Sequence, residues 1–256
     1  MIKIAIIGAG NMGSAIARSL ADSKEYELIV SNRSKGKLDI LKDEYDNIDI
    51  TSDNNRAVKM ADVVILAVKP WIIKDVIDKL NLSDTQIVVS VAAGISLKDL
   101  LLFTGNIGFV YRVMPNTAIS VKQSVNLIST DCRLEEKNEL VFNVFNKLGT
   151  AIYLPEDQME AATSLASCGI AYVMKYIQAA MQAGVEMGIN PKDAQLMVSQ
   201  CVLGAGKILL DKNLHPSSEI DKVTTPGGLT IKGINTLECE GFPAAIIKAL
   251  KASANK

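Results

Sequence analysis

The chain has 256 residues, of which 48% are hydrophobic and 21% charged, and its formal net charge is −1. This length and composition allow two domains with buried cores and argue against a disordered chain. The balanced charge, without a dense Lys/Arg run, argues against nucleic acid as a partner. Lys175, Glu186 and Lys207 interrupt the most apolar later stretches before the ~20 residues that a bilayer span needs. We therefore expect no membrane partner.

The sequence contains one histidine, His215, and four widely spaced cysteines that form no CxxC pair: Cys132, Cys168, Cys201 and Cys239. Neighbouring ligands for zinc are therefore missing from the sequence, and no metal is expected. Reduced thiols of this kind are typical of a cytoplasmic protein, which is the compartment we expect. His215 precedes Pro216 in a polar loop and is interpreted as a surface residue rather than a general acid.

Residues 1–155 alternate short apolar segments with amphipathic ones. The expected strands are IKIAIIG, YELIVSN, IDIT, DVVILAV, QIVVSVA, IGFVYRV, SVNLIS and TAIYL. Helices are expected between them, for example over 12–22, 34–43, 70–80 and 135–147. Almost wholly apolar strands are typical of parallel strands covered on both faces. Residues 1–155 thus predict a Rossmann-type, doubly wound α/β domain that binds a dinucleotide.

Residues 156–256 show helical periodicity alone, which predicts an all-helical second domain. One of its helices should begin at Pro191 with Asn190 as its N-cap, after Gly188 ends the preceding helix. Its apolar residues recur at helical spacing and predict a buried stripe: Ala194, Met197, Val198, Cys201, Val202, Ala205, Ile208 and Leu209. Such a domain needs a partner surface, so we expect a homo-oligomer that shares these helices.

Gly8, Gly10 and Gly13 form a G-x-G-x-x-G turn between the first expected strand and the first expected helix. In this context Gly8 allows the tight turn, Gly10 lets the backbone approach a pyrophosphate, and Gly13 lets helix and strand pack closely. The amide groups at the start of the helix then face the phosphates. The turn predicts nucleotide binding.

The end of the second strand, IVSNRSKGK, discriminates between the two nicotinamide cofactors. Asn32 stands where an NAD-selective site carries an acid for the ribose 2′-hydroxyl. Arg33 and Ser34 follow it, and a guanidinium beside a hydroxyl suits a 2′-phosphate. We therefore expect NADPH as the cofactor, with NADH bound less tightly.

A second distinctive stretch is VTTPGGLTIKGINTLE, residues 223–238. Glycines before a helix expose several backbone amides together, and the hydroxyls of Thr224, Thr225 and Thr230 add donors. This arrangement suits a small carboxylate or phosphate. An ordinary capped helix start remains the alternative from the residues alone.

Six segments, in this order and spacing, resemble the pyrroline-5-carboxylate reductase family: GAGNMG, SNR, ADVVILAVKP, VSVAAGIS, RVMPNTA and VTTPGGLTIKGI…LE…GF. The resemblance covers nearly the whole chain, and TTPGGLT is its most specific part. It implies reduction of 1-pyrroline-5-carboxylate to L-proline by NADPH or NADH, the last step of proline biosynthesis. It also implies a homodimer formed through the C-terminal helices, with dimers often assembled into larger rings.

The resemblance also implies the roles of individual residues. Cofactor contacts are expected at Gly8, Gly10, Asn11, Met12, Gly13, Asn32, Arg33, Ser34, Asn55, Ala67, Val68, Lys69, Pro70, Met114 and Pro115. Substrate contacts are expected at Asn116, Thr225, Gly227, Gly228 and Thr230. A protonated cyclic imine is already electrophilic, so hydride transfer needs positioning rather than a nucleophile or a metal. Thr230 is expected to be the catalytic residue, by hydrogen bonding near the ring nitrogen.

One segment departs from the family pattern. Where the family reads ALSGSGPAY, this chain places Ala166 and Cys168 at the two serines, Ser167 at a glycine and Ile170 at the proline. Gln178 and Gln182 replace acids farther along, and Lys175 adds a positive charge. The departures admit compensated drift, a paralogue that acts on another small cyclic imine, or a non-catalytic nucleotide-binding regulator. A β-hydroxyacid dehydrogenase with Lys175 as proton carrier is a further alternative, but it leaves the TTPGGLT segment unexplained.

Overall fold

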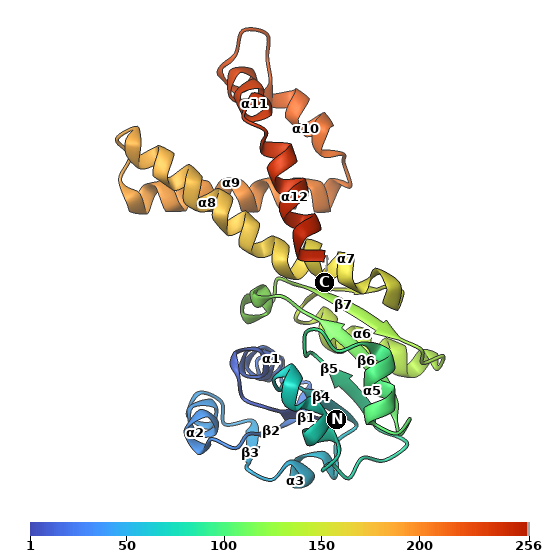
Figure 1. Cartoon of the computed structure of the whole chain (residues 1–256). Coiled ribbons are helices and arrows are strands. Elements are labelled where there is room, and N and C mark those ends of the chain that lie inside the picture. Colours follow the sequence, from blue (N-terminus) through green and yellow to red (C-terminus); the bar gives the residue numbers. More distant parts are fainter. Residues whose placement is uncertain (255–256) are drawn as a thin grey trace. The chain divides into compact units, whose positions relative to one another are not determined.

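The computed structural model describes residues Met1–Ala254, which form two compact units. The first unit is Met1–Ser167, and the second begins at Cys168 (Figure 1). The first unit thus includes a short helical segment after residue 155, where the sequence pattern changes from strand to helix.

An eight-stranded sheet forms the centre of the first unit, and all eight predicted strands are confirmed. The strands are β1 (Ile2–Ile7), β2 (Tyr26–Ser31), β3 (Ile48–Thr51), β4 (Val63–Leu66), β5 (Ile87–Ser90), β6 (Phe109–Met114), β7 (Ser124–Thr130) and β8 (Gly149–Tyr153). Their order is β3-β2-β1-β4-β5-β6-β7-β8, the order of a doubly wound sheet extended at one edge. The pairing is parallel throughout except between β6 and β7. The connection between those two strands is too short for a crossover helix, so β7 returns antiparallel.

Helices cover both faces of the sheet. They are α1 (Asn11–Ala21), α2 (Lys35–Glu44), α3 (Asn54–Val58), α4 (Ile73–Ile77), α5 (Leu97–Phe103), α6 (Glu135–Asn146) and α7 (Met159–Thr163), with the shorter turns η1 (Pro70–Ile72), η2 (Thr117–Val121), η3 (Glu156–Gln158) and η4 (Ser164–Cys168). Helices α1, α2 and α6 pack on one face, whereas α3, α4 and α5 pack on the other (Figure 1). The central strands are therefore buried on both sides, which is why their sequences are almost wholly apolar.

One ion pair lies largely out of water beside β6. The Nη1 atom of Arg112 is 2.5 Å from Oε1 of Glu156, and the side chains are 8% and 32% exposed. The same carboxylate oxygen accepts a hydrogen bond of 3.0 Å from the backbone N–H of Leu97. Glu156 thus joins the start of α5 to the middle of the sheet. A charged residue inside the apolar run FVYRVM needs such a partner.

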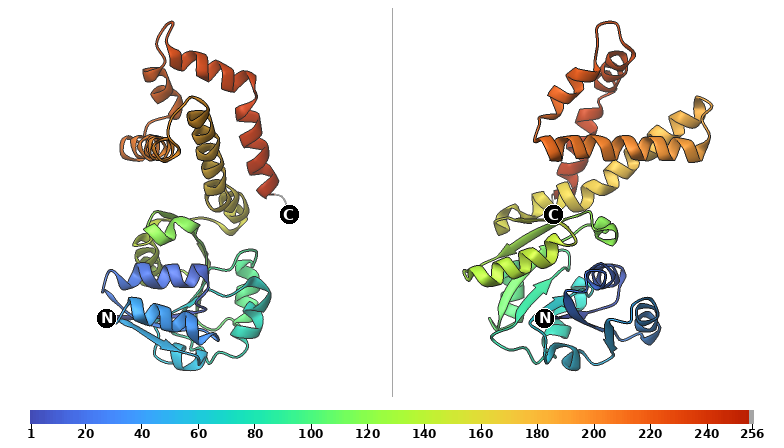
Figure 2. Two further views of the ribbon diagram at one scale, coloured as in Figure 1. Left: turned by 90° about the vertical axis from the view of Figure 1, so that its left-hand side faces the viewer. Right: turned by 180° about the vertical axis from the view of Figure 1, so that it is seen from behind.

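The second unit is all-helical, as predicted. It contains α8 (Gly169–Glu186), α9 (Pro191–Lys212), α10 (Pro216–Val223), α11 (Leu229–Cys239) and α12 (Phe242–Ala254). Asn190 caps α9 by accepting a hydrogen bond from the N–H of Lys192, as the sequence predicts. Helices α8 and α9 pack side by side (Figure 2), and they approach closely where Gly184 meets Ala194. Among residues 1–254, no helix combines the length and apolar character needed to cross a bilayer.

The predicted buried stripe of α9 is wrong for the single chain. Ala194 is buried, but Met197, Cys201, Ala205 and Ile208 are exposed. Other large apolar side chains are exposed as well, including Leu210 on α9 at 83% and Leu229 on α11 at 85%. Helical periodicity identifies an apolar face, but it does not say whether the same chain covers that face. An exposed apolar surface of this kind is typical of an interface with another molecule.

The Arg112–Glu156 pair should contribute more to stability than a surface pair of the same length. We expect Glu156→Ala to lower the free energy of unfolding by about 2–4 kcal/mol, because it leaves a buried guanidinium without its partner. Urea unfolding followed by circular dichroism measures this change.

Glu44→Ala is the matched control. Its carboxylate is also 2.5 Å from an arginine, Arg18, but the two side chains are 42% and 38% exposed. An exposed pair contributes less than about 1 kcal/mol. Equal losses for the two variants would show that burial does not set the strength of the Arg112–Glu156 pair.

Candidate nucleotide and substrate sites

The glycine turn connects β1 to α1 at the carboxyl edge of the sheet. Gly8 has a φ of +109°, and a Cβ placed there would lie 2.6 Å from the carbonyl oxygen of Ala67. A Cβ on Gly13 would lie 1.9 Å from the carbonyl oxygen of Gly8. Both positions therefore require glycine for structural reasons.

Gly10 is different, because nothing lies within 4 Å of a Cβ placed there. It is the N-cap of α1 and offers no side chain to the free amide groups of the first helical turn, which include those of Asn11, Met12 and Gly13. These amides and the helix dipole favour an anion. The open space beside Gly10 leaves room for a phosphate group to approach them.

Asn32 connects the glycine turn to the end of β2. Its Oδ1 accepts a hydrogen bond of 3.1 Å from the N–H of Ala9, and its Nδ2 donates to the carbonyl of Ser34 at 3.0 Å. The N–H of Gly8 donates to the carbonyl of Ser31 at 2.7 Å. Asn32 therefore holds two predicted phosphate-binding loops together, a role that the sequence did not reveal.

Cationic side chains gather at the start of α2. Arg33, Lys35 and Lys37 are exposed, and Ser34 is the N-cap of α2 without a side-chain capping bond. The free amides of the helix start add their dipole to these charges. This corner of the sheet suits a phosphate rather than a ribose hydroxyl, in agreement with the missing acid at position 32.

The loop after β4 lies against the glycine turn. Ala67 donates to the carbonyl of Ile7 at 2.9 Å, and Lys69 and Pro70 lead into η1. Trp71, the single tryptophan of the chain, is 77% exposed, and the Lys69 ammonium lies 5.7 Å from the centre of its ring. The structure thus places Ala67 and Val68 beside Gly8, and their contacts with a cofactor stay predictions.

Asn55 supports the loop that follows α4. Its Nδ2 donates to the carbonyl of Lys79 at 2.9 Å, and its Oδ1 accepts from the N–H of Asn81 at 2.8 Å. One amide hydrogen remains for a ligand. The ribose contact expected at Asn55 stays a prediction.

The segment Met114–Pro115–Asn116 follows β6 at the same edge of the sheet and is buried. Asn116 caps η2 through Oδ1, which accepts from the N–H of Ala118 at 3.0 Å, and its own N–H donates to Oγ of Ser124 at 3.0 Å. These bonds give the segment a fixed backbone conformation. The predicted contacts of Met114, Pro115 and Asn116 with ligands stay predictions.

The second predicted site lies in the helical unit, at the start of α11. Thr225–Pro226–Gly227–Gly228 form a turn in which the N–H of Gly228 donates to the carbonyl of Thr225 at 2.9 Å and Gly227 has a φ of +72°. Gly228 is the N-cap of α11 and carries no capping side chain, so the first amides of the helix are free. Thr225 and Thr230 are exposed beside them. This arrangement can bind a small carboxylate.

Three further side chains have a structural explanation. The Thr224 hydroxyl donates to the carbonyls of Ile220 and Asp221, so it belongs to the end of α10 rather than to the exposed turn. His215 is exposed and caps α10, with Nδ1 accepting from the N–H of Ser217 at 3.3 Å. The Lys175 ammonium donates to Oε1 of Gln178 at 2.9 Å.

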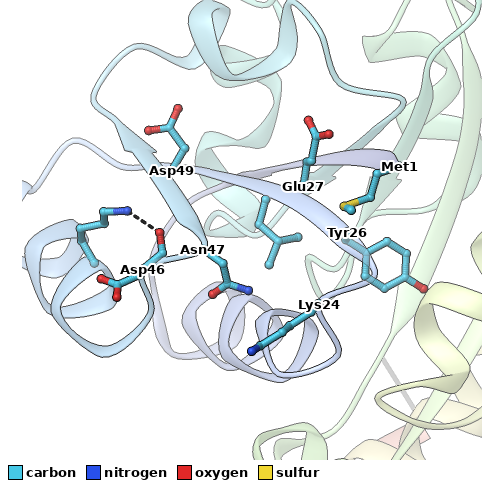
Figure 3. Close-up of a pocket in the computed structure, with 9 residues that line it drawn as sticks. Met1, Lys24, Tyr26, Glu27, Asp46, Asn47 and Asp49 are labelled. Atoms are coloured by element: carbon cyan, nitrogen blue, oxygen red, sulfur yellow. Dashed lines mark hydrogen bonds between the residues drawn. The ribbon is translucent and has the colours of Figure 1, made fainter.

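A shallow hollow at the opposite edge of the sheet is not part of these sites. Met1, Tyr26, Glu27, Asn47 and Asp49 line it at the amino ends of β1, β2 and β3 (Figure 3). Ligands of open α/β sheets bind outside the carboxyl ends of the strands. The hollow therefore carries no functional assignment.

The parallel sheet, the glycine turn at its carboxyl edge and the basic start of α2 define a dinucleotide-binding protein of the Rossmann type. Residues 156–256 match the family model described as pyrroline-5-carboxylate reductase dimerisation, and residues 3–94 match that of the coenzyme F420-dependent NADP oxidoreductases. Pyrroline-5-carboxylate reductase 1 of Dictyostelium discoideum is 36% identical over 99% of this chain. Pyrroline-5-carboxylate reductase of Glycine max is also 36% identical, over 99% of this chain and 94% of its own length. The chain belongs to the pyrroline-5-carboxylate reductase family.

Solved structures agree with this assignment. A pyrroline-5-carboxylate reductase from Coxiella burnetii superposes with a TM-score of 0.89 at 31% identity, covering 98% of this chain and 96% of that one. The Plasmodium falciparum pyrroline carboxylate reductase with NADP bound gives 0.87 at 25% identity, covering 99% and 95%. The chain spans about half (49%) of the length of the Dictyostelium relative.

Gly10 tests whether the turn binds a pyrophosphate. Because a Cβ at Gly10 meets no protein atom, we expect Gly10→Ala to fold normally but to bind NADPH about 10- to 100-fold more weakly, since the methyl group blocks the backbone from the phosphates. Fluorescence of Trp71 and calorimetry both measure the affinity.

Gly13→Ala is the contrasting variant. Its Cβ would overlap the Gly8 carbonyl, so the unfolding midpoint itself should fall. NADPH affinity that stays at the wild-type value in folded Gly10→Ala would contradict the assignment of the turn.

Arg33 tests the choice of cofactor. We expect Arg33→Ala to weaken NADPH binding by about 1–3 kcal/mol and to change NADH binding little, because only NADPH carries the 2′-phosphate. Lys42→Ala is the control, since its ammonium bonds to the backbone carbonyls of Asp46, in the loop before β3, and of Ile48, the first residue of β3. Equal losses for NADPH and NADH in Arg33→Ala would remove the 2′-phosphate assignment.

Proposed function

We propose that the protein reduces the cyclic imine 1-pyrroline-5-carboxylate to L-proline with NADPH, the last step of proline biosynthesis. The observation that carries this proposal is the turn at Thr225–Gly228 with the uncapped start of α11. It offers backbone amides and hydroxyls to a small carboxylate, while the first unit offers a glycine turn and a basic helix start to a phosphorylated dinucleotide. The NADP bound to the Plasmodium falciparum relative supports the choice of cofactor.

Gly8, Gly10, Asn11, Met12 and Gly13 would hold the pyrophosphate, and Arg33 with Ser34 would hold the 2′-phosphate. Asn32 fixes the loops that present these groups. Loop 67–70 and the segment Met114–Pro115 would border the rest of the cofactor. When bound, NADPH supplies the hydride for the reaction.

The proposed reaction requires the protein to orient the substrate and does not require a nucleophilic side chain. Hydride adds to the imine carbon, the electrons of the C=N bond move to the nitrogen, and that nitrogen keeps the proton that it carries as an iminium ion. Thr225, Gly227 and Gly228 would hold the carboxylate, and the Thr230 hydroxyl would bond near the ring nitrogen. Holding a reactant in the geometry of attack can lower a barrier by about 7–11 kcal/mol.

We infer a homodimer formed through the C-terminal helices, with dimers able to assemble into a larger ring. The dimerisation model over residues 156–256 and the exposed apolar faces of α8, α9 and α11 support it. The cytoplasm is the proposed compartment, on the chemistry of the four free cysteines.

Reduction of a different small cyclic imine is the second candidate function. It is favoured by Ala166 and Cys168, which remove two hydroxyls of the family pattern. Purified protein should be mixed with NADPH and either 1-pyrroline-5-carboxylate or another cyclic imine. In separate reactions it should be mixed with NADP and a 3-hydroxy acid. The absorbance of the reduced nicotinamide is followed in both. Fastest NADPH oxidation with 1-pyrroline-5-carboxylate supports the proposal, whereas tight NADPH binding without turnover of any substrate supports a regulator.

Thr230→Val tests the catalytic assignment. We expect kcat to fall by about tenfold or more, because the variant removes one hydrogen bond near the reacting nitrogen, while NADPH affinity stays within about twofold. Thr236→Val is the control, since that hydroxyl donates to the carbonyl of Lys232 on the same helix. A collapse of cofactor affinity in Thr230→Val would assign the residue to the cofactor instead.

A further inference from the structure

Two consecutive residues of η4 bond to the segment that follows β6. The Ser167 hydroxyl donates to the carbonyl of Pro115 at 3.0 Å, and Nδ2 of Asn116 donates to the carbonyl of Ala166 at 3.2 Å. Ser167 is separated from Pro115 by 52 positions in the sequence. These bonds therefore tie a helical turn to the end of a strand across the fold.

The conformation of η4 explains how both bonds can form. Ser164–Cys168 is a π-helical turn between α7 and α8. A π-turn is wider than an α-helical one and shifts its backbone bonds, and such turns are frequent at functional sites. Within this turn the carbonyl of Ala166 accepts the bond from Asn116, and the hydroxyl of Ser167 reaches the carbonyl of Pro115.

The segment 156–168 is also held at its other end. Glu156 pairs with Arg112, two residues before Met114 on β6. The chain after residue 155 is thus attached to the end of β6 at both of its ends. Between these attachments, Met159 and Ala166 pack with Met114 and Leu127 in a small apolar cluster.

The Ser167 hydroxyl anchors the backbone at Pro115, which has few other ways to be held. Proline has no backbone N–H, so the segment lacks one anchor that any other residue could supply. Pro115 is buried, and a buried carbonyl that loses its donor destabilises the local conformation. Ser167 stands where the family pattern has glycine, which has no hydroxyl, so this attachment belongs to this chain.

We propose that Ser167 is a positioning residue that fixes the backbone of Met114–Pro115–Asn116 through the Pro115 carbonyl. This inference rests on the proposed function for its consequence, because that segment is expected to border the nicotinamide. Ser167 itself contacts neither reactant.

Ser167→Ala and Ser167→Gly remove the hydroxyl, and Ser167→Thr keeps it. Steady-state kinetics with 1-pyrroline-5-carboxylate and hydrogen exchange of peptides spanning 113–121 are measured on the full chain. For Ala and Gly we expect exchange to be about three- to tenfold faster in those peptides, because one hydrogen bond is lost. We expect kcat to fall by a similar factor of about three to ten, with the KM for NADPH nearly unchanged. Threonine should restore both quantities to within about twofold.

Ser120→Ala is the matched control. Its hydroxyl donates to the carbonyl of Thr117 at 3.1 Å in the adjacent turn η2, so the variant loses a bond of similar length without touching Pro115. We expect its kcat to equal that of the wild type. The glycine variant keeps the test decisive if alanine prevents folding.

The outcomes separate this inference from the proposed function. Wild-type protein that fails to reduce 1-pyrroline-5-carboxylate refutes the proposed function, while the exchange measurement still decides whether Ser167 fixes the segment. Unchanged exchange in Ser167→Ala and Ser167→Gly overturns the inference, and so does faster exchange with wild-type kcat. Faster exchange together with lower kcat in the alanine and glycine variants, both restored by Ser167→Thr, supports the inference.

Discussion

The close approach between the carbonyl oxygen of Gly8 and the backbone of Gly13 is the constraint on which the nucleotide site depends. A Cβ at residue 13 would lie 1.9 Å from that oxygen, so α1 can pack against β1 at this distance only with glycine. β1 pairs with both β2 and β4 at the centre of the sheet. The position of α1 therefore determines where its free amides lie relative to the loops after β2 and β4. Asn32 and Ala67 complete that arrangement through bonds to the same turn.

The predicted sites of both units consist mainly of backbone groups. In the first unit the helix starts of α1 and α2 present amides, and in the second the turn at Thr225–Gly228 does so. Among the predicted site residues, the charged side chains are Arg33 at the start of α2 and Lys69 in the loop after β4. A substrate that is electrophilic once protonated requires little more than such fixed dipoles, which cost no reorganisation during the reaction. This fits the near-neutral net charge of the chain.

The parts of the fold that follow from local sequence were predictable. The central strands have almost wholly apolar sequences because they are buried on both faces, and the glycine turn was evident from its place between strand and helix. Attachments between distant segments were not predictable. Arg112 lies in an apolar strand, but 44 positions separate it from Glu156 and no local pattern identifies that residue as its partner. The bond from Ser167 to Pro115 is made from a π-turn, which has no clear sequence pattern.

The apolar face of α9 shows a different limit of sequence-based prediction. Helical periodicity identified the face correctly, but most of that face is not buried within the single chain. Its exposed apolar side chains have a consequence for the living cell. A protein whose second unit buries its apolar surface only against another molecule has a stability that depends on its own concentration. Such a chain is most vulnerable to proteolysis and aggregation just after synthesis, before it meets a partner. At low concentration such a protein dissociates into chains that are less stable. It then loses folded molecules as well as activity.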